Sequence, residues 1–315
     1  MKVVALAGGV GAAKFLAGLV SANPAEDLTV IGNTGDDAVI HGLHISPDLD
    51  IVTYTLAGEV GEMGWGFRSD TTHALTQMRN YGAPAWFTLG DRDLGTHLAR
   101  TTWLAEGMTL SEVTERIRCA LGVVVKIIPM SDDPVSTKLT TADGIGRDFQ
   151  EYFVKFGHTE QIRDVKFDGA AHAAPAPGVL DAVAASTRII ICPSNPVLSI
   201  EPILSVPGIR ESLAERRNDV YAVTPIIEGA ALKGPADKLL PLRGADVSAV
   251  GVAGLYRDFC GNFVIDSRDL RLQGDVAALD IRPIVADTIM STPERAHQLA
   301  MAVLARRPGS DSPEH

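Results

Sequence analysis

The chain has 315 residues, of which 46% are hydrophobic, and a net charge of -11. This length suits one large α/β domain, or a core with a small subdomain, and the hydrophobic share is enough to fill a sizeable core. The acidic balance argues against a general nucleic-acid-binding protein, which needs a basic face to neutralise phosphates. It does not exclude a small phosphorylated ligand, because local side chains and a metal ion decide that binding.

The cysteines and the hydrophobic runs indicate the compartment. Cys119, Cys192 and Cys260 are far apart and form no CxxC pair, which argues against a zinc site or a disulfide framework. The opening MKVVALAGG shows no secretory signal pattern. No apolar run approaches the roughly 18 residues of a membrane-spanning helix. We therefore expect a cytoplasmic protein without a membrane partner.

The first 35 residues have a strand–helix–strand pattern. A β-branched run over 3–7 ends in two glycines, apolar residues follow at helical spacing over 14–20, and a second strand is predicted over 28–31. Gly32 and Gly35 mark the turn after that strand. A βαβ unit of this kind predicts a parallel sheet with a right-handed crossover.

Next come three predicted helices over 71–81, 93–106 and 109–121, the last with a capping-box pattern. A short strand is predicted over 85–88. Together these elements predict a helical subregion at about 66–122 beside the sheet.

Strands and helices alternate through the rest of the chain. The residue patterns predict strands over 123–128, 138–141, 149–156, 162–167, 188–192, 219–223, 263–265 and 282–285, and helices over 230–240, 247–258 and 293–306. The pairing around 138–167 is expected to be partly antiparallel. We predict a Rossmann-like α/β fold with a parallel-sheet core and a smaller, mainly helical portion, in a single domain over 1–306. The polar segment 307–315 is expected to be a disordered tail.

The first candidate site is the glycine turn, with Gly8, Gly9, Gly11 and Lys14. A glycine turn between a strand and a helix lets backbone N–H groups approach a phosphate, and the positive end of the helix dipole favours its charge. The pattern is not a Walker A loop, and Lys14 stands where a dinucleotide fingerprint has its third glycine. A tight turn that merely packs the first helix is the competing interpretation.

The second candidate is a cluster of carboxylates after the second strand: Asp36, Asp37, Asp48 and Asp50. Carboxylates gathered in one place repel each other unless a cation or protons intervene, and oxygen ligands suit Mg²⁺ or Mn²⁺. Individual members could instead cap turns and helices. His41 and His44 lie between the two acidic pairs and are expected to orient the loop or a substrate group; a role as transition-metal ligands is the alternative, which no Cys or third His supports.

Two further loops follow predicted strands. Asp91 and Arg92 are expected to project at the end of one strand, where Arg92 could pair with a phosphate or with the nearby carboxylates. Ser194 and Asn195 could donate to phosphates or to a base edge. Ordinary strand-to-helix turns would explain both segments as well.

A parallel sheet places the carboxyl ends of its strands at one edge, where ligands bind. All four candidate segments are therefore expected to converge on one cleft. Trp65 or Trp86 could stack on a flat ring there, although core packing would explain these tryptophans equally well.

These motifs, in their order along the chain, resemble the 2-phospho-L-lactate transferase family, which includes phosphoenolpyruvate transferases. The resemblance spans residues 1 to about 305. It is carried by Gly8–Lys14, Asn33–Asp37, Ser46–Asp50, Thr53–Thr55, Leu89–Asp93, Thr96–His97, Phe149–Tyr152, Pro193–Pro196, Pro207–Ile209 and Lys233–Asp237.

The resemblance implies a homodimer that takes part in coenzyme F-420 biosynthesis. The acceptor would be Fo, a 5-deazaflavin with a ribityl chain, and the donor a guanosine diphosphate ester of lactate or enolpyruvate. The terminal ribityl hydroxyl would attack the donor phosphate that carries the small acid, and GMP would leave. Such a diphosphate donor calls for a metal ion to neutralise charge during transfer, Mg²⁺ or possibly Mn²⁺.

The resemblance and the residue chemistry together give three residue sets. The catalytic and metal-binding set is Asp36, Asp37 and Asp50, and an aspartate in or near it is the expected general base. The Fo-binding set is Asp50, Thr88, Asp91 and Arg92, where Thr88 replaces an arginine found in some family members. The guanosine diphosphate-binding set is Gly8, Gly9, Gly11, Lys14, Ser194 and Asn195.

Two other functions fit part of the pattern. A nucleotide-sugar-binding regulatory protein of the gluconeogenesis-factor type would share the glycine loop without needing catalysis. An NAD(P)-linked oxidoreductase fits less well because of Lys14 and the paired aspartates. The identity of the small acid is not readable from the residues, since the possible acids differ by a few atoms.

Overall fold

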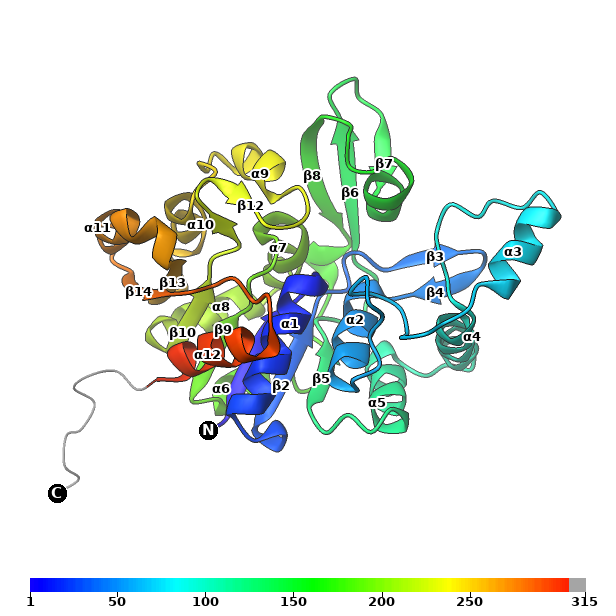
Figure 1. Ribbon diagram of the computed structural model, residues 1–315, viewed down its shortest axis with the longest axis horizontal. Coiled ribbons are helices and arrows are strands. Elements are labelled where there is room, and N and C mark those ends of the chain that lie inside the picture. The colour runs from blue at the N-terminus through cyan, green and yellow to red at the C-terminus, as the bar shows by residue number, and fades with distance from the viewer. Residues whose placement is uncertain (306–315) are drawn as a thin grey trace.

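The core of the molecule is a seven-stranded parallel sheet (Figure 1). The structure is a computed structural model that describes residues 1–305, so the segment 307–315 lies outside the described residues. The strand order is β14-β13-β10-β9-β1-β2-β5. The strands are β1 (Val3–Ala7), β2 (Leu28–Gly32), β5 (Lys126–Pro129), β9 (Arg188–Ile191), β10 (Val220–Val223), β13 (Asn262–Asp266) and β14 (Arg282–Ala286). The predicted α/β fold class is confirmed.

Helices cover both faces of this sheet, which is why every residue of β1, β9, β10 and β13 is buried. One face packs against α1 (Gly9–Ala22), α2 (Pro47–Leu56) and α12 (Pro293–Leu304). The other packs against α6 (Val179–Ala185), α8 (Ile209–Glu215) and α10 (Ala249–Tyr256). This arrangement fixes the loops after β1, β2 and β9 at one edge of the sheet.

The helical subregion extends from one end of the sheet (Figure 1). It contains α3 (His73–Asn80), α4 (Asp91–Ala105) and α5 (Leu110–Ala120), and the hairpin of β3 (Ala38–Ile40) and β4 (Leu43–Ile45) lies beside it. The predicted capping box at the start of α5 is confirmed. The strand predicted over 85–88 is wrong, because this segment pairs with no strand and packs the partly buried side chains of Trp86 and Phe87 against the hairpin.

Two carboxylates accept hydrogen bonds from the first backbone N–H groups of α3 and α4, and each carboxylate comes from the segment of the other helix. Asp91, on α4, accepts hydrogen bonds from the N–H groups of His73 (2.9 Å) and Ala74 (3.0 Å), at the start of α3. Asp70, just before α3, accepts from the N–H of Arg92 at 2.9 Å, at the start of α4. Each helix start therefore depends on a residue of the other segment.

A small antiparallel sheet, β7-β6-β8, stands above the carboxyl edge of the main sheet (Figure 1). Its strands are β6 (Ser136–Thr141), β7 (Gly146–Asp148) and β8 (Ile162–Asp168). The strand predicted over 149–156 is wrong: Glu151–Lys155 form a π-helical turn. Phe149, Tyr152 and Phe153 pack in one hydrophobic cluster, with the rings of Phe149 and Phe153 stacked at 5.4 Å.

The remaining elements are short, and the helix expected over 230–240 is reduced to one turn after Pro235. They are η1 (Ala25–Asp27), η3 (Ala170–His172), η4 (Pro196–Ile200), α7 (Glu201–Leu204), η5 (Arg217–Asp219), β11 (Ile226–Ile227), β12 (Ala230–Ala231), α9 (Ala236–Leu239), η6 (Leu240–Arg243), η7 (Ser267–Leu272) and α11 (Gln273–Ala277). Among residues 1–305, no helix has the length and apolar character that crossing a membrane requires.

Candidate functional site

The loops after β1 and β9 meet at the carboxyl edge of the sheet. The Ser194 hydroxyl donates to the carbonyl of Gly8 at 2.9 Å. The α1 helix begins directly at Gly9, and a Cβ on Gly11 would lie only 2.5 Å from the carbonyl oxygen of Pro193. Glycine is therefore required at position 11 for this close approach. The expected proximity of the glycine turn and Ser194 is confirmed.

A carboxylate of the chain itself occupies the start of α1. Asp48 accepts from the Gly9 N–H at 2.8 Å and from Asn33 Nδ2 at 2.9 Å. A Cβ on Gly8 would lie 2.5 Å from this carboxylate. Burial raises the pKa of Asp48 to about 6. The anion-attracting helix start thus holds Asp48 at the place where the sequence predicted a phosphate.

The other predicted donor-binding residues differ in their surroundings. Asn195 caps the turn that follows it through its side-chain oxygen, and its Nδ2 is buried without a hydrogen-bond partner. Lys14 is exposed on α1 and borders a cavity of about 510 Å³ together with Thr292 and His297. That cavity is not lined by any of the predicted carboxylates.

Asp36 and Asp37 border a second cavity of about 670 Å³, which lies beyond the end of β2 and is also lined by Thr34 and Trp86. One oxygen of each carboxylate and the Thr34 hydroxyl are buried without a hydrogen-bond partner. The other Asp37 oxygen accepts from Ser46 at 2.6 Å. Burial raises the pKa of both carboxyls well above the ordinary value, and the neighbouring Asp48 adds to the shift of Asp36. Free, buried oxygens of this kind are suited to a cation.

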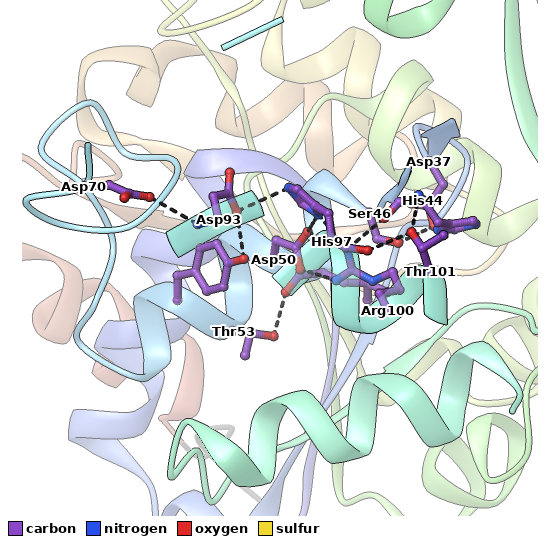
Figure 2. Close-up of polar contacts among 12 residues, drawn as sticks. Asp37, His44, Ser46, Asp50, Thr53, Asp70, Asp93, His97, Arg100 and Thr101 are labelled. Atoms are coloured by element: carbon purple, nitrogen blue, oxygen red, sulfur yellow. Dashed lines mark hydrogen bonds and ion pairs between the residues drawn. The ribbon is translucent and has the colours of Figure 1, made fainter. Parts of the chain in front are cut away.

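Asp50 belongs to a buried charged network between α2 and α4 (Figure 2). Both of its oxygens accept from Arg100, with Oδ2 lying 3.0 Å from Nη1. His97 lies 3.8 Å from Asp50 Oδ2 and 3.4 Å from Asp93 Oδ1. The Tyr54 hydroxyl donates to Asp93 at 2.8 Å. Asp50 is therefore held as one half of a two-pronged ion pair.

Sequence reasoning did not single out Arg100. The signal for it is its spacing from Asp93 and His97, since positions i, i+4 and i+7 share one face of a helix. All three side chains are buried, at 8%, 1% and 2% exposure.

The remaining predicted Fo-binding residues lie outside the lining of the 670 Å³ cavity. Thr88 is exposed and Asp91 caps α3. Arg92 is exposed, pairs with Glu59 at 3.1 Å and lies 4.4 Å above the Phe67 ring. Of the two tryptophans considered, Trp86 borders the cavity, whereas Trp65 is not part of its lining.

Within residues 1–305, no group of three or more His, Cys, Asp or Glu side chains is arranged to hold a metal ion. Asp50 faces Arg100, so the free oxygens belong to Asp36 and Asp37. Mg²⁺ typically uses one or two carboxylates and completes its shell with water and substrate phosphates. The arrangement therefore fits a cation that binds together with a phosphorylated substrate.

The histidines between the two acidic pairs differ in exposure. His44 borders the cavity with a buried, unpartnered Nδ1, and burial, followed by the charge of Arg100, lowers its pKa. His41 is exposed in the turn of the β3–β4 hairpin.

Comparison with known proteins identifies the family. Residues 3–278 match the model of 2-phospho-L-lactate transferase CofD. The chain is 42% identical to a phosphoenolpyruvate transferase of Kitasatospora aureofaciens, over 97% of each protein. It is 39% identical to a 2-phospho-L-lactate transferase of Methanosarcina mazei, over 96% of this chain and 99% of that protein.

A solved structure of a UPF0052 family protein from Bacillus halodurans matches with a TM-score of 0.65. The match covers 96% of this chain and 98% of the other at 16% identity, so it shows a shared fold. The sequence matches extend over nearly the whole chain and combine with a carboxylate-lined cavity at the sheet edge. The protein is a transferase and belongs to the 2-phospho-L-lactate transferase family.

Proposed function

We propose that the protein acts in coenzyme F-420 biosynthesis and transfers a phospholactyl or phosphoenolpyruvyl group from a guanosine diphosphate donor to Fo. The observation that carries the proposal is the pair Asp36 and Asp37, whose free, buried oxygens border a cavity of about 670 Å³ in a chain of this family. The acids named in the proposal are those in the names of the relatives. We further propose a cytoplasmic homodimer.

The reaction is a substitution at phosphorus. The terminal ribityl hydroxyl of Fo attacks the phosphate that bears the small acid, and the bond from this phosphorus to the oxygen of GMP breaks. The hydroxyl proton passes to a general base, for which we propose an aspartate in or near the carboxylate cluster. Asp36 and Asp37 would hold Mg²⁺ or Mn²⁺, which neutralises charge on the donor phosphates. Because each carboxylate already has a buried, unpartnered oxygen and both residues line the cavity, they need little rearrangement to meet a cation that enters with the donor.

We propose that the guanosine diphosphate donor binds to the loops after β1 and β9. Gly8, Gly9, Gly11, Lys14, Ser194 and Asn195 form this set, and the unpartnered Asn195 Nδ2 offers a free hydrogen-bond donor. A phosphate at the Gly9 N–H would take the place that Asp48 now occupies. Displacement of Asp48 is therefore a requirement of this binding mode.

We propose that the acceptor Fo binds at the wall of the 670 Å³ cavity and along the adjoining helical subregion. Trp86 gives the deazaflavin ring an aromatic surface at the cavity. Asp50, Thr88, Asp91 and Arg92 form the proposed Fo-binding set, and Arg100 holds Asp50 in a fixed orientation.

The direct test is mass spectrometry of the product after incubation with Fo, Mg²⁺ and either the lactyl or the enolpyruvyl guanosine diphosphate donor. We expect a phosphodiester of Fo together with GMP, loss of product in EDTA, and recovery with Mg²⁺ or Mn²⁺. Full turnover by metal-free enzyme would contradict the role of Asp36 and Asp37. Comparison of the two donors identifies the small acid.

Nucleotide preference provides a second test. Calorimetry is expected to show tighter binding of GDP than of ADP in the presence of Mg²⁺. Equal or tighter binding of ADP would count against a guanosine donor.

A further inference from the structure

Helix α4 holds the β4 strand at His44 through both of its backbone groups (Figure 2). The His44 N–H donates to the Thr101 hydroxyl at 2.8 Å, and Arg100 Nη1 donates to the His44 carbonyl at 3.4 Å. Two residues further on, the Ser46 hydroxyl donates to Asp37 at 2.6 Å. A continuous chain of contacts thus runs from Arg100 through the end of β4 to Asp37.

Charged groups near Asp37 belong to the same chain of contacts. Arg100 is 2% exposed, and its positive charge acts on both Asp50 and Asp37. The other charges that act strongly on Asp37 are the carboxylates of Asp50 and Asp48. Burying an ion pair costs desolvation energy, so such a pair is weak evidence for a role in stability alone. Its position beside a carboxylate with an unpartnered oxygen points to the site.

We propose that Arg100 is a positioning residue for the cation and the donor, an inference that rests on the proposed function. Arg100 does not border the 670 Å³ cavity, so it acts through other residues. Its guanidinium donates hydrogen bonds to Asp50 on α2 and to the His44 carbonyl on β4. By joining these two elements it holds Ser46 and Asp37 in the orientation that receives the cation.

The test measures Mg²⁺-dependent binding of GDP by calorimetry, alongside thermal unfolding. The main variant is the double substitution Asp50→Asn with Arg100→Met, which removes the pair together and leaves neither partner as an unpaired buried charge. Because Asp50 also belongs to the proposed Fo-binding set, the readout is GDP binding and not turnover. We expect GDP binding in Mg²⁺ to weaken roughly ten- to hundredfold, the usual effect of losing a residue that orients a metal ligand. Binding of GDP in EDTA is expected to stay unchanged.

Two single variants sharpen the result. Arg100→Lys keeps the charge but cannot reach both Asp50 oxygens and the His44 carbonyl at once, so we expect an intermediate loss of binding with a near-native melting temperature. Arg116→Met is the matched control. Arg116 is exposed on α5, lies over Trp103 at 4.2 Å, and its loss should leave binding unchanged.

Native Mg²⁺-dependent binding by the folded double variant would overturn the inference and leave the pair a purely structural one. If the double variant does not fold, Arg100→Lys decides in the same way: weakened binding supports the inference and native binding overturns it. Failure of the unaltered protein to bind GDP with Mg²⁺ would overturn the proposed function as well.

Discussion

The parallel sheet and the contact between α2 and α4 are buried in opposite ways. The sheet buries apolar side chains, as in β9, where Ile189, Ile190 and Ile191 are each 0% exposed. Helix α4 instead turns Asp93, His97 and Arg100 inward, while Leu98 on the same helix is 51% exposed. Both regions are well buried, so burial alone does not reveal what a region contributes.

The difference lies in the free energy that burial brings. Each Å² of apolar surface removed from water contributes about 25 cal/mol to stability. A buried charge must first lose its hydration, and its ion pair often does no more than offset that cost. We infer that the sheet supplies most of the free energy of folding, whereas the charged contact orders the site. Substitutions in the two regions should therefore affect different measurements.

The largest effect is expected in the sheet. Ile190→Ala removes a fully buried side chain from the central strand β9 and should lower the free energy of unfolding by about 2–5 kcal/mol. Denaturant titration measures this loss. Turnover per folded molecule should stay native, because Ile190 does not border either cavity described above. A large loss of turnover in fully folded protein would contradict the inference that the sheet contributes mainly stability.

The next effect concerns a carboxylate at the cavity. Asp36→Asn should lower turnover roughly a hundredfold, or about 2.7 kcal/mol of transition-state stabilisation. Burial already disfavours the charged form of Asp36, so a neutral amide should leave the melting temperature equal or higher. Steady-state kinetics and thermal unfolding of the same preparation separate the two results.

Asp164→Asn is the matched control for this substitution. Asp164 lies on β8, where it pairs with Lys166 at 3.4 Å, and its loss should change neither turnover nor stability noticeably. Native turnover of Asp36→Asn would remove Asp36 from the site.

The smallest effect is expected at a helix start on the sheet side. The Ser248 hydroxyl accepts from the Gly251 N–H at 3.0 Å and caps α10. Ser248→Ala should lower the free energy of unfolding by about 1 kcal/mol without any change in turnover. Denaturant titration again measures it, with the glycine variant Ser248→Gly expected to lose less. A drop in turnover would contradict this prediction and show that the start of α10 influences the cavity.

Much of the sheet could be predicted from the sequence. The segment 3–7 was expected as a strand and is one, and 188–192 differs by one residue from β9. These strands are buried on both faces, so each appears mainly as an apolar run, over 3–7 and 189–192, between turn residues. The segment 149–156 was mistaken for a strand because short aromatic runs have no clear period.

The charged contact could not be predicted in the same way. The spacing of Asp93, His97 and Arg100 places them on one face of a helix, but a polar stripe on a helix normally faces water, so their burial could not be predicted. Their partner Asp50 is separated from Arg100 by 50 positions in the chain, and local patterns do not report contacts over such a separation. For the same reason the arrival of Asp48 at the start of α1 was not foreseen.

The reciprocal caps of α3 and α4 have a consequence for local unfolding. Asp91 on α4 caps α3, and Asp70 in the segment just before α3 caps α4, so fraying of α4 removes the acceptor of α3, and loss of order before α3 removes the acceptor of α4. The two helices should therefore open together as one cooperative unit and protect their first-turn amide hydrogens from exchange to a similar degree. Helix α4 also carries Arg100, so the opening of an exposed cap is coupled through the helix to the order of the buried charges.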